Sequence, residues 1–260
     1  MSPFLLSPLW LNYVQVFMFV AWIGCWVHLT IRFKRVLMVD YKELRRNMVD
    51  CQLRPNDITD LRILEAMDTV PREAFVPEAL KPVVYADKEV ELVGRLESRG
   101  PRSMLTPITL ATLVQMADIQ KDDFVLDIGC LSGYSSAVLA SLADSVIAVE
   151  TVPDMAKQAG SILSDLQIVN VAVVEGGLAQ GQAAQGPYDA ILINGAVEAV
   201  PEELLSQLKD GGRLVTVMME NGFGRAVCFV RTGGVVGSSS QTDLPAPLLS
   251  EFVAVQEFVL

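Results

Sequence analysis

The strongest constraint on the fold is an alternation of short apolar runs and helix-compatible segments between residues 124 and 218. The apolar runs predict strands at 124–128, 145–150, 170–175, 188–194 and 212–218. Helices are expected between them at 134–143, 153–166 and 201–208. Strands joined by helices in this way predict a mostly parallel sheet with helices on both faces. We therefore expect a doubly wound α/β fold of the Rossmann-like kind.

Two further segments are expected as antiparallel edge strands, "RAVCFVRTGG" (225–234) and the apolar end "FVAVQEFVL" (252–260). Upstream of the alternation, residues 40–80 predict helices, with Thr59 or Asp60 as an N-cap and Pro71 closing the second helix. Residues 86–107 predict a loop, and a helix is expected from Pro107 to about Ala117.

Composition excludes several classes of function. The net charge of -11 gives no electrostatic footprint for nucleic-acid binding. The four cysteines lack CxxC spacing, which argues against a disulfide framework or a zinc site and fits a reducing compartment. His28 is the only histidine and lies outside the expected globular part, so we expect no metal site and no imidazole-based triad there.

The first 37 residues differ from the rest of the chain. The run from Leu9 to Ile31 carries no formally charged side chain and is long enough to cross a bilayer as a helix, which takes about 20 residues. Basic residues follow it at once, and an anchor of this orientation would leave the downstream domain in the cytoplasm, at the inner membrane. The competing interpretation is a start codon assigned too early, with Met38 beginning a cytoplasmic protein.

We accordingly expect three parts: residues 1–37 as an apolar N-terminal segment, 38–118 as a helical and substrate-loop region, and 119–260 as a cofactor-binding domain. Membrane contact, if any, is expected through residues 9–31.

The turn "DIGCLSGY" (127–134) follows the first strand of the alternation, where ligands bind in open α/β sheets. Its glycines, Gly129 and Gly133, do not match the GxGxxG spacing of dinucleotide-binding loops, which disfavours an NAD oxidoreductase. An acidic residue, Asp127, before a G-x-x-x-G core is similar to motif I of S-adenosylmethionine (SAM) methyltransferases. Glu150 ends the next strand, where a carboxylate can accept hydrogen bonds from both ribose hydroxyls. The alternative for the glycine pair alone is an ordinary strand-to-helix turn.

A longer stretch, "RRNMVDCQLRPNDITDLRILEAMDTVPREAFVPEALKPVVYAD" (45–87), resembles the N-terminal part of protein-L-isoaspartate O-methyltransferases. The resemblance resumes at "LTPITLATLVQMADIQKDDFVLDIG" and at "YDAILINGAVEAVPEELLSQLKDGGRLV". It implies a SAM-dependent carboxyl O-methyltransferase that methylates isoaspartyl residues in damaged proteins or peptides.

The resemblance also implies site residues. The cofactor residues would be Asp127, Gly129, Cys130, Gly133, Glu150, Gly177 and Leu178. The substrate residues would be Arg102, Ser103, Pro107, Gly195 and Ala196, with Leu105, Thr106 and Asn194 at the catalytic positions.

Three positions depart from the family pattern. Leu131 stands where the family has glycine, and we expect its side chain to turn away from the cofactor, as in related small-molecule O-methyltransferases. Gly177 replaces the aspartate expected near the adenine amine, at the loss of one hydrogen bond of about 1 kcal/mol. Leu105, in "RSMLTP", occupies the place of the family's serine, so Ser103 and Thr106 are the nearest hydroxyls. Arg102 could serve instead as a bidentate anchor for a carboxylate, or be a solvated loop charge.

Methyl transfer to a carboxylate needs no general base, because the nucleophile is already ionised at neutral pH. A domain without histidine suits such a reaction. Two alternatives follow from the departures: a SAM methyltransferase of the same fold with another acceptor, or a SAM-binding protein without repair activity.

Overall fold

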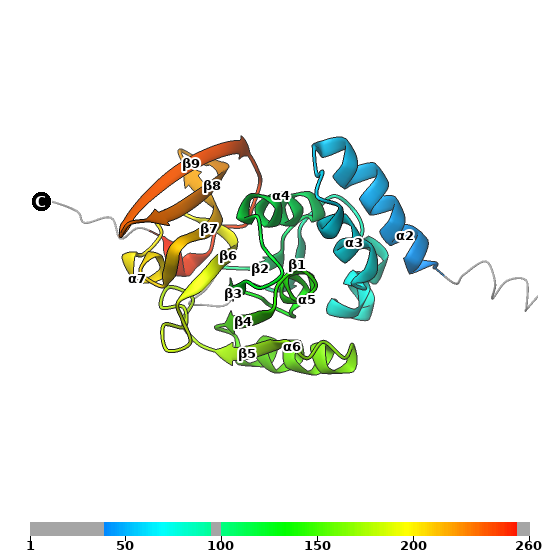
Figure 1. The fold of residues 1–260 in the computed structure, drawn as a ribbon. Coiled ribbons are helices and arrows are strands. Elements are labelled where there is room, and N and C mark those ends of the chain that lie inside the picture. Colours follow the sequence, from blue (N-terminus) through cyan, green and yellow to red (C-terminus); the bar gives the residue numbers. More distant parts are fainter. Residues whose placement is uncertain (1–38, 95–99, 254–260) are drawn as a thin grey trace, which may run out of the picture. The chain divides into compact units, whose positions relative to one another are not determined.

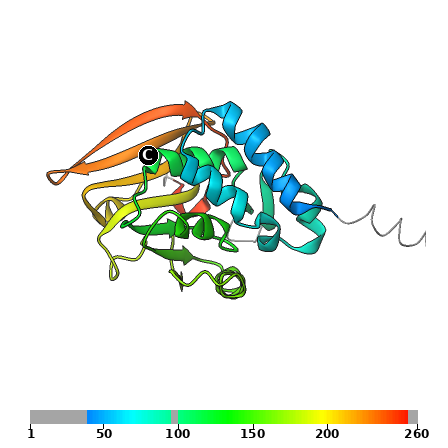
Figure 2. The ribbon, with the colours of Figure 1, turned by 45° about the vertical axis from the view of Figure 1, so that its right-hand side comes forward.

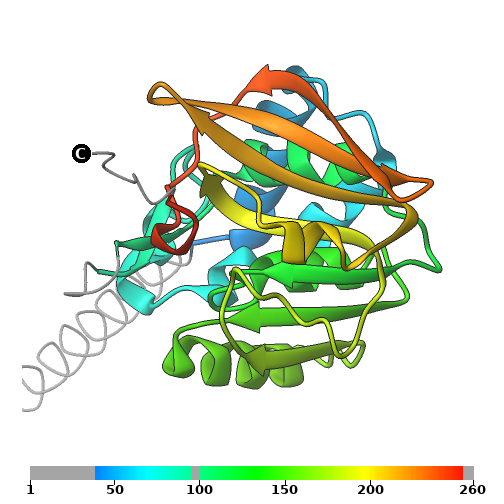
Figure 3. The same ribbon diagram turned by 90° about the vertical axis from the view of Figure 1, so that its left-hand side faces the viewer.

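The main sheet lies at the centre of the fold. A computed structural model of the chain describes residues 39–94 and 100–253. Among these residues the sheet has seven strands in the order β5-β4-β3-β6-β7-β8-β9 (Figures 1 and 3). The strands are β3 (Phe124–Ile128), β4 (Ser145–Glu150), β5 (Val171–Glu175), β6 (Tyr188–Val197), β7 (Leu208–Glu220), β8 (Phe223–Thr232) and β9 (Val235–Asp243). Strands β3 to β7 pair in parallel, whereas β8 and β9 pair antiparallel. The predicted α/β class is confirmed.

Each face of the sheet packs into its own hydrophobic cluster because successive strand residues point to opposite faces. Val125 of β3 belongs to the larger cluster, and its neighbours Leu126 and Ile128 belong to the other. The larger cluster includes residues of the helices α4 (Pro107–Ala117), α5 (Tyr134–Ala140) and α6 (Pro153–Asp165). The short helix α7 (Glu202–Leu205) and turns after β5 and β9 contribute to the second cluster.

The N-terminal helix α3 (Leu61–Thr69) packs beside α4 and α5, and α2 (Tyr41–Met48) packs against α3, so both extend the larger cluster (Figure 2). Of the two predicted N-caps, Thr59 and Asp60, it is Asp60 that caps α3. Its side chain accepts a hydrogen bond from the Arg62 amide at 2.8 Å. Short helical turns continue α2 and follow α3, at Val49–Leu53, Arg54–Asn56, Arg72–Phe75 and Glu78–Val83.

The segment predicted as a loop at 86–107 contains a two-stranded antiparallel pair, β1 (Val90–Val93) with β2 (Arg102–Met104). Its strands are short and interrupted by a register shift, which explains why no alternating pattern marks them. All three residues of β2 are buried. This pair brings two of the predicted substrate residues, Arg102 and Ser103, against the main sheet, where Arg102 pairs with Glu150 at the end of β4.

The last antiparallel strand is β9, which the sequence analysis did not predict. Gly233 and Gly234 have φ values of 58° and 82°, and Thr232 pairs with Val235 across them. Two left-handed residues form a tight hairpin turn, so the strand restarts immediately. The strand predicted from Phe252 is wrong at its first residue, which lies in a 3₁₀ turn (Ser250–Phe252), and residues 254–260 lie outside the described part.

The predicted apolar N-terminal segment lies outside the described residues. No helix among the residues that the structure describes is long and apolar enough to cross a membrane. The described residues from Tyr41 onward belong to one compact unit, and the predicted boundary at residue 118 falls within it.

The central strand supplies a test of the packing. Leu126 is fully buried in the second cluster. We expect Leu126→Ala to lower the free energy of unfolding by roughly 2–5 kcal/mol, because the truncated side chain leaves a cavity. Chemical denaturation measures the change, with Val169→Ala as the control, since Val169 is 92% exposed. Equal effects of the two substitutions would contradict the assigned core.

Candidate functional site

The candidate site lies at the carboxyl ends of β3 and β4, beside the point where the strand order reverses. From β3 the chain passes to β4 and β5 on one side, and then returns to β6 on the other. Ligands of open α/β sheets bind at such a switch point. Asp127 and Glu150, predicted from the sequence, stand at the ends of β3 and β4 and are both fully buried.

The loop between β3 and α5 is built from left-handed residues. Gly129 and Gly133 have φ values of 77° and 95°, which glycine adopts without steric cost. Leu131 has a φ of 51°, an uncommon conformation for a residue with a Cβ. Its side chain is only 2% exposed and belongs to the larger hydrophobic cluster. Burial of this side chain therefore offsets the strain that its backbone carries.

Asp127 accepts hydrogen bonds on both carboxylate oxygens. The hydroxyls of Ser135 and Ser136, in the first turn of α5, donate to Oδ2 at 2.8 and 2.5 Å. The side-chain amide of Asn194, on β6, donates to Oδ1 and also to the Ile128 carbonyl at 3.3 Å. Asp127 thus ties β3, α5 and β6 together, and positions the loop from within the protein.

Burial raises the pKa of Asp127 from 3.8 to about 6, although the hydrogen bonds from Ser136, Ser135 and Asn194 favour the charged form. The neighbouring Glu150 adds to the rise through like-charge repulsion. Asp127 is therefore ionised at neutral pH and takes up a proton in mildly acidic solution.

Glu150 is surrounded by donors. The backbone amide of Leu131 donates to Oε2 at 2.8 Å, and those of Thr151 and Val152 donate to Oε1 at 2.9 and 3.0 Å. The guanidinium of Arg102, on β2, donates from Nη1 to Oε1 at 3.3 Å and from Nη2 to Oε2 at 3.2 Å. Both side chains of this ion pair are almost completely buried.

The pairing with Glu150 corrects the prediction for Arg102. Of the two predicted alternatives, the solvated charge is wrong, because the Arg102 side chain is buried and paired, and the anchor for a substrate carboxylate stays a prediction. The Glu150 carboxylate already accepts from both terminal nitrogens of the Arg102 guanidinium. The sequence could not show this, because the two residues are far apart in the chain.

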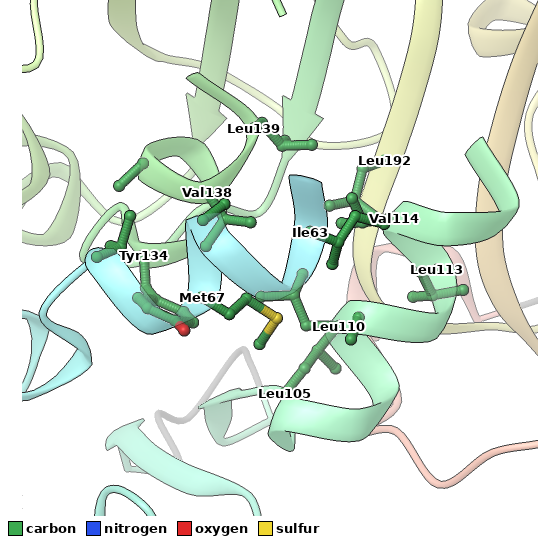
Figure 4. Packing of buried hydrophobic residues seen from close by; sticks show 14 of the residues in the cluster. Ile63, Met67, Leu105, Leu110, Leu113, Val114, Tyr134, Val138, Leu139 and Leu192 are labelled. Carbon is green, nitrogen blue, oxygen red and sulfur yellow. The ribbon is translucent and has the colours of Figure 1, made fainter. Parts of the chain in front are cut away.

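Two of the predicted catalytic positions, Leu105 at the place of the family's serine and the neighbouring Thr106, also have structural roles. The Leu105 side chain points into the larger cluster, among residues such as Met67 and Leu110 (Figure 4). Thr106 caps α4: its hydroxyl accepts from the Thr109 amide at 3.1 Å and pairs with the Thr109 hydroxyl at 3.0 Å. Neither side chain is free to act on a substrate in this arrangement.

A small cavity of about 20 Å³ joins the loop to the β2 segment, with room for about one water molecule. Its lining includes the predicted residues Ser103, Gly129, Cys130 and Asn194. Burial raises the pKa of the Cys130 thiol well above its ordinary value, so this cysteine is no thiolate nucleophile. The described residues contain no group of three or more histidine, cysteine or acidic side chains placed to hold a metal ion.

Leu105 also lines this cavity, whereas the remaining predicted residues do not. Gly195 is packed so closely that a Cβ there would come within 2.5 Å of the Leu249 side chain. Ala196 is fully buried and bonded to the backbone of Pro247 and Leu249. Pro107 is buried in the first turn of α4, Leu178 is buried in the second cluster, and Gly177 is exposed after β5.

Arg72 is a site residue that the sequence analysis missed, although it lies in the quoted stretch "VPREAFVPEAL". Its side chain is fully buried, lines the cavity, and donates to the carbonyls of Val84 at 3.0 Å and Leu105 at 2.7 Å. The guanidinium carbon lies 4.7 Å from the centroid of the Tyr134 ring. Burial lowers the pKa of Arg72, and the adjacent Tyr134 favours its charged form.

The charge of Arg72 has no acidic partner: no carboxylate of the described residues forms an ion pair with it. By distance and angle its Nη1 and the hydroxyl of Tyr134 form no hydrogen bond, and these buried groups interact with each other only electrostatically. A buried cation with an unused donor is costly unless a ligand completes it.

Comparison with known proteins identifies relatives of this chain. The model of the family "Protein-L-isoaspartate(D-aspartate) O-methyltransferase (PCMT)" matches residues 44–243. A protein-L-isoaspartate O-methyltransferase 2 of Marinobacter nauticus is 40% identical over 74% of this chain and 85% of the relative. An enzyme of the same name without the numeral, from Herpetosiphon aurantiacus, is 40% identical over 67% of this chain and 75% of the relative.

Two solved structures share the fold. One, a protein-L-isoaspartate O-methyltransferase, has a TM-score of 0.69 and 24% identity, and the match covers 78% of this chain and 65% of the other. The second is a putative enzyme of that kind from Plasmodium falciparum in complex with S-adenosyl-L-homocysteine. It has a TM-score of 0.67 and 19% identity, with 80% of this chain and 98% of the other covered.

The raised pKa of Asp127 predicts a particular pH dependence of stability. The folded protein holds this proton up to about pH 6, whereas the unfolded chain releases it near pH 4. The contribution of Asp127 to the free energy of unfolding therefore falls as pH rises through this window. We expect the stability difference between wild type and Asp127→Asn to fall by about 1 kcal/mol between roughly pH 5 and 7.5. Urea denaturation at both pH values measures it, and a constant or growing difference would contradict the assignment.

Proposed function

The chain belongs to the protein-L-isoaspartate O-methyltransferase family, and we propose that it transfers a methyl group from SAM to the free carboxylate of isoaspartyl residues in altered proteins. The comparisons confirm the family resemblance, the methyltransferase class and SAM as the cofactor. The geometry of the site indicates which residues would bind the cofactor and which would bind the acceptor.

The residues at the carboxyl ends of β3 and β4 fit the cofactor chemically. Glu150 presents a buried carboxylate for ribose hydroxyls, and the loop from Gly129 to Gly133 brings backbone close to it. Gly177 and Leu178, after β5, complete the predicted set. When bound, SAM supplies a methyl group activated by a positively charged sulfur.

Arg72 carries the proposal for the acceptor. It is a buried cation with which no carboxylate in residues 39–94 and 100–253 forms an ion pair, and it lines a cavity with Gly129 and Asn194. A substrate carboxylate is the group that such a guanidinium binds best. Holding one carboxylate oxygen on Arg72 would leave the other oxygen to attack the methyl carbon.

This chemistry uses positioning and exclusion of water. The acceptor is ionised at neutral pH, so no residue has to remove a proton. The C–O bond forms as the C–S bond breaks, and the electron pair goes to sulfur. Orientation of the two reactants can supply much of the rate enhancement, because it removes the entropic cost of their encounter.

Methyl transfer tests the proposal directly. The full chain is incubated with methyl-labelled SAM and two peptides that differ only in carrying isoaspartate or aspartate at one position. We expect base-labile label on the isoaspartyl peptide alone. Absence of label, in protein shown to bind S-adenosylhomocysteine (SAH), would contradict isoaspartyl specificity and favour another acceptor, in keeping with the burial of Leu105.

Arg72 supplies a second test. We expect Arg72→Lys to raise the KM for the isoaspartyl peptide by roughly 10- to 100-fold, since charged hydrogen bonds contribute about 1.5–3 kcal/mol. The affinity for SAH should change less than the KM, because Arg72 contacts neither Glu150 nor the loop glycines through hydrogen bonds. The control is Arg46→Lys, which alters an exposed arginine paired only at the surface. An unchanged KM, or equal losses of peptide and SAH binding, would argue against a role in acceptor binding.

A further inference from the structure

The pairing of Arg102 with Glu150 places a side chain of the protein in the cofactor site. Both terminal nitrogens of the guanidinium face the carboxylate, at 3.3 and 3.2 Å. The same guanidinium lies over the loop: a Cβ at Gly129 would come within 2.8 Å of Nη2. The space between the end of β4 and the glycine loop is therefore filled by Arg102.

Glu150 cannot accept hydrogen bonds from Arg102 and from a ribose at the same time, because its hydrogen-bonding capacity is limited. An ionised carboxylate offers about four lone-pair sites. The amides of Leu131, Thr151 and Val152 use three of them, and the two nitrogens of Arg102 supply two more donors. Two ribose hydroxyls cannot be added to this set. The three amides belong to the backbone of the loop and of the β4 end, so Arg102 is the group that can leave.

The size of the cavity leads to the same conclusion. Small-molecule sites usually enclose about 300–1,000 Å³. The cavity beside Gly129 and Cys130 holds about 20 Å³. Neither Arg102 nor Glu150 lines this cavity, so a ribose that reaches Glu150 has to take the space that the Arg102 side chain fills.

We propose that Arg102 occupies the ribose site in the cofactor-free protein and must leave Glu150 when SAM or SAH binds. This inference rests on the proposed function, because it takes the ligand of Glu150 to be the ribose of that cofactor. Arg102 then holds the Glu150 carboxylate in place in the cofactor-free protein and competes with the cofactor for it. It also couples the cofactor site to β2, which carries Ser103 at the edge of the same cavity.

Competition of this kind lowers the apparent affinity in proportion to the fraction of molecules in the open arrangement. If the closed arrangement holds about nine tenths of the molecules, removal of the guanidinium lowers the Kd for SAH roughly tenfold. Arg102→Gln removes the charge and the fork. Arg102→Lys keeps the charge but offers a single point contact, so we expect an intermediate Kd.

Isothermal titration of the full chain with SAH tests the proposal, with Arg225→Gln as the matched control. Arg225 loses the same charge but forms an exposed pair with Asp243 on β9, away from the β3 and β4 ends. We expect the affinity order Arg102→Gln, then Arg102→Lys, then wild type and the control together. An Arg102→Gln variant that binds SAH as wild type does, or more weakly, overturns the competition and leaves the proposed function standing. Failure of wild type and both variants to bind SAH overturns the competition together with the proposed cofactor site.

Loss of Arg102 leaves Glu150 buried without a cation, which can impair folding. A measurement on the wild type avoids this problem. In protein labelled with ¹⁵N-arginine, the Arg102 side-chain signal should shift when SAH saturates the site, whereas the Arg225 signal stays in place. An unmoved Arg102 signal at saturation overturns the proposal.

Discussion

The structure around the site depends on the burial of two carboxylates, Asp127 and Glu150, at the ends of neighbouring parallel strands. A buried ionised carboxylate is tolerated only when donors surround it. Different parts of the chain provide those donors: the first turn of α5 and the β6 amide for Asp127, and the loop backbone and β2 for Glu150. Satisfying the two acids therefore fixes the loop, the helix after it and the strand pair above it in one arrangement.

The N-terminal region completes this arrangement from the other side. The Ser132 hydroxyl donates to the Phe75 carbonyl at 2.6 Å, and the Phe75 ring packs edge-on against Tyr134. Arg72 joins the same contact and holds the Leu105 carbonyl. The loop from Gly129 to Leu131 thus lies between a carboxylate suited to a ribose, Glu150, which accepts from the Leu131 amide, and the cavity in which Arg72 offers a cation suited to an acidic acceptor. That pairing of charges is what transfer of a methyl group from a nucleoside cofactor to a carboxylate requires.

The sequence predicted the features that depend on local pattern. The strand at 124–128 and the helix at 107–117 were predicted with the bounds that the structure gives them, because apolar periodicity and the proline in the first turn mark them locally. The ends of β3 and β4 followed from the same pattern. The pairing of Arg102 with Glu150 and the buried state of Arg72 could not be predicted, since each depends on contacts between distant segments. The cap formed by Thr106 was predictable from its place before Pro107, because threonine is favoured before the first turn of a helix and proline within it.

The central claim is that Glu150 is a shared site, held by Arg102 until a cofactor ribose takes its place. A crystal structure of the full chain with SAH tests this most directly. The account predicts both ribose hydroxyls within hydrogen-bond distance of Glu150, the Leu131 amide still bonded to that carboxylate, and the Arg102 guanidinium displaced from it. A structure in which SAH is bound while Arg102 and Glu150 remain paired would contradict the account.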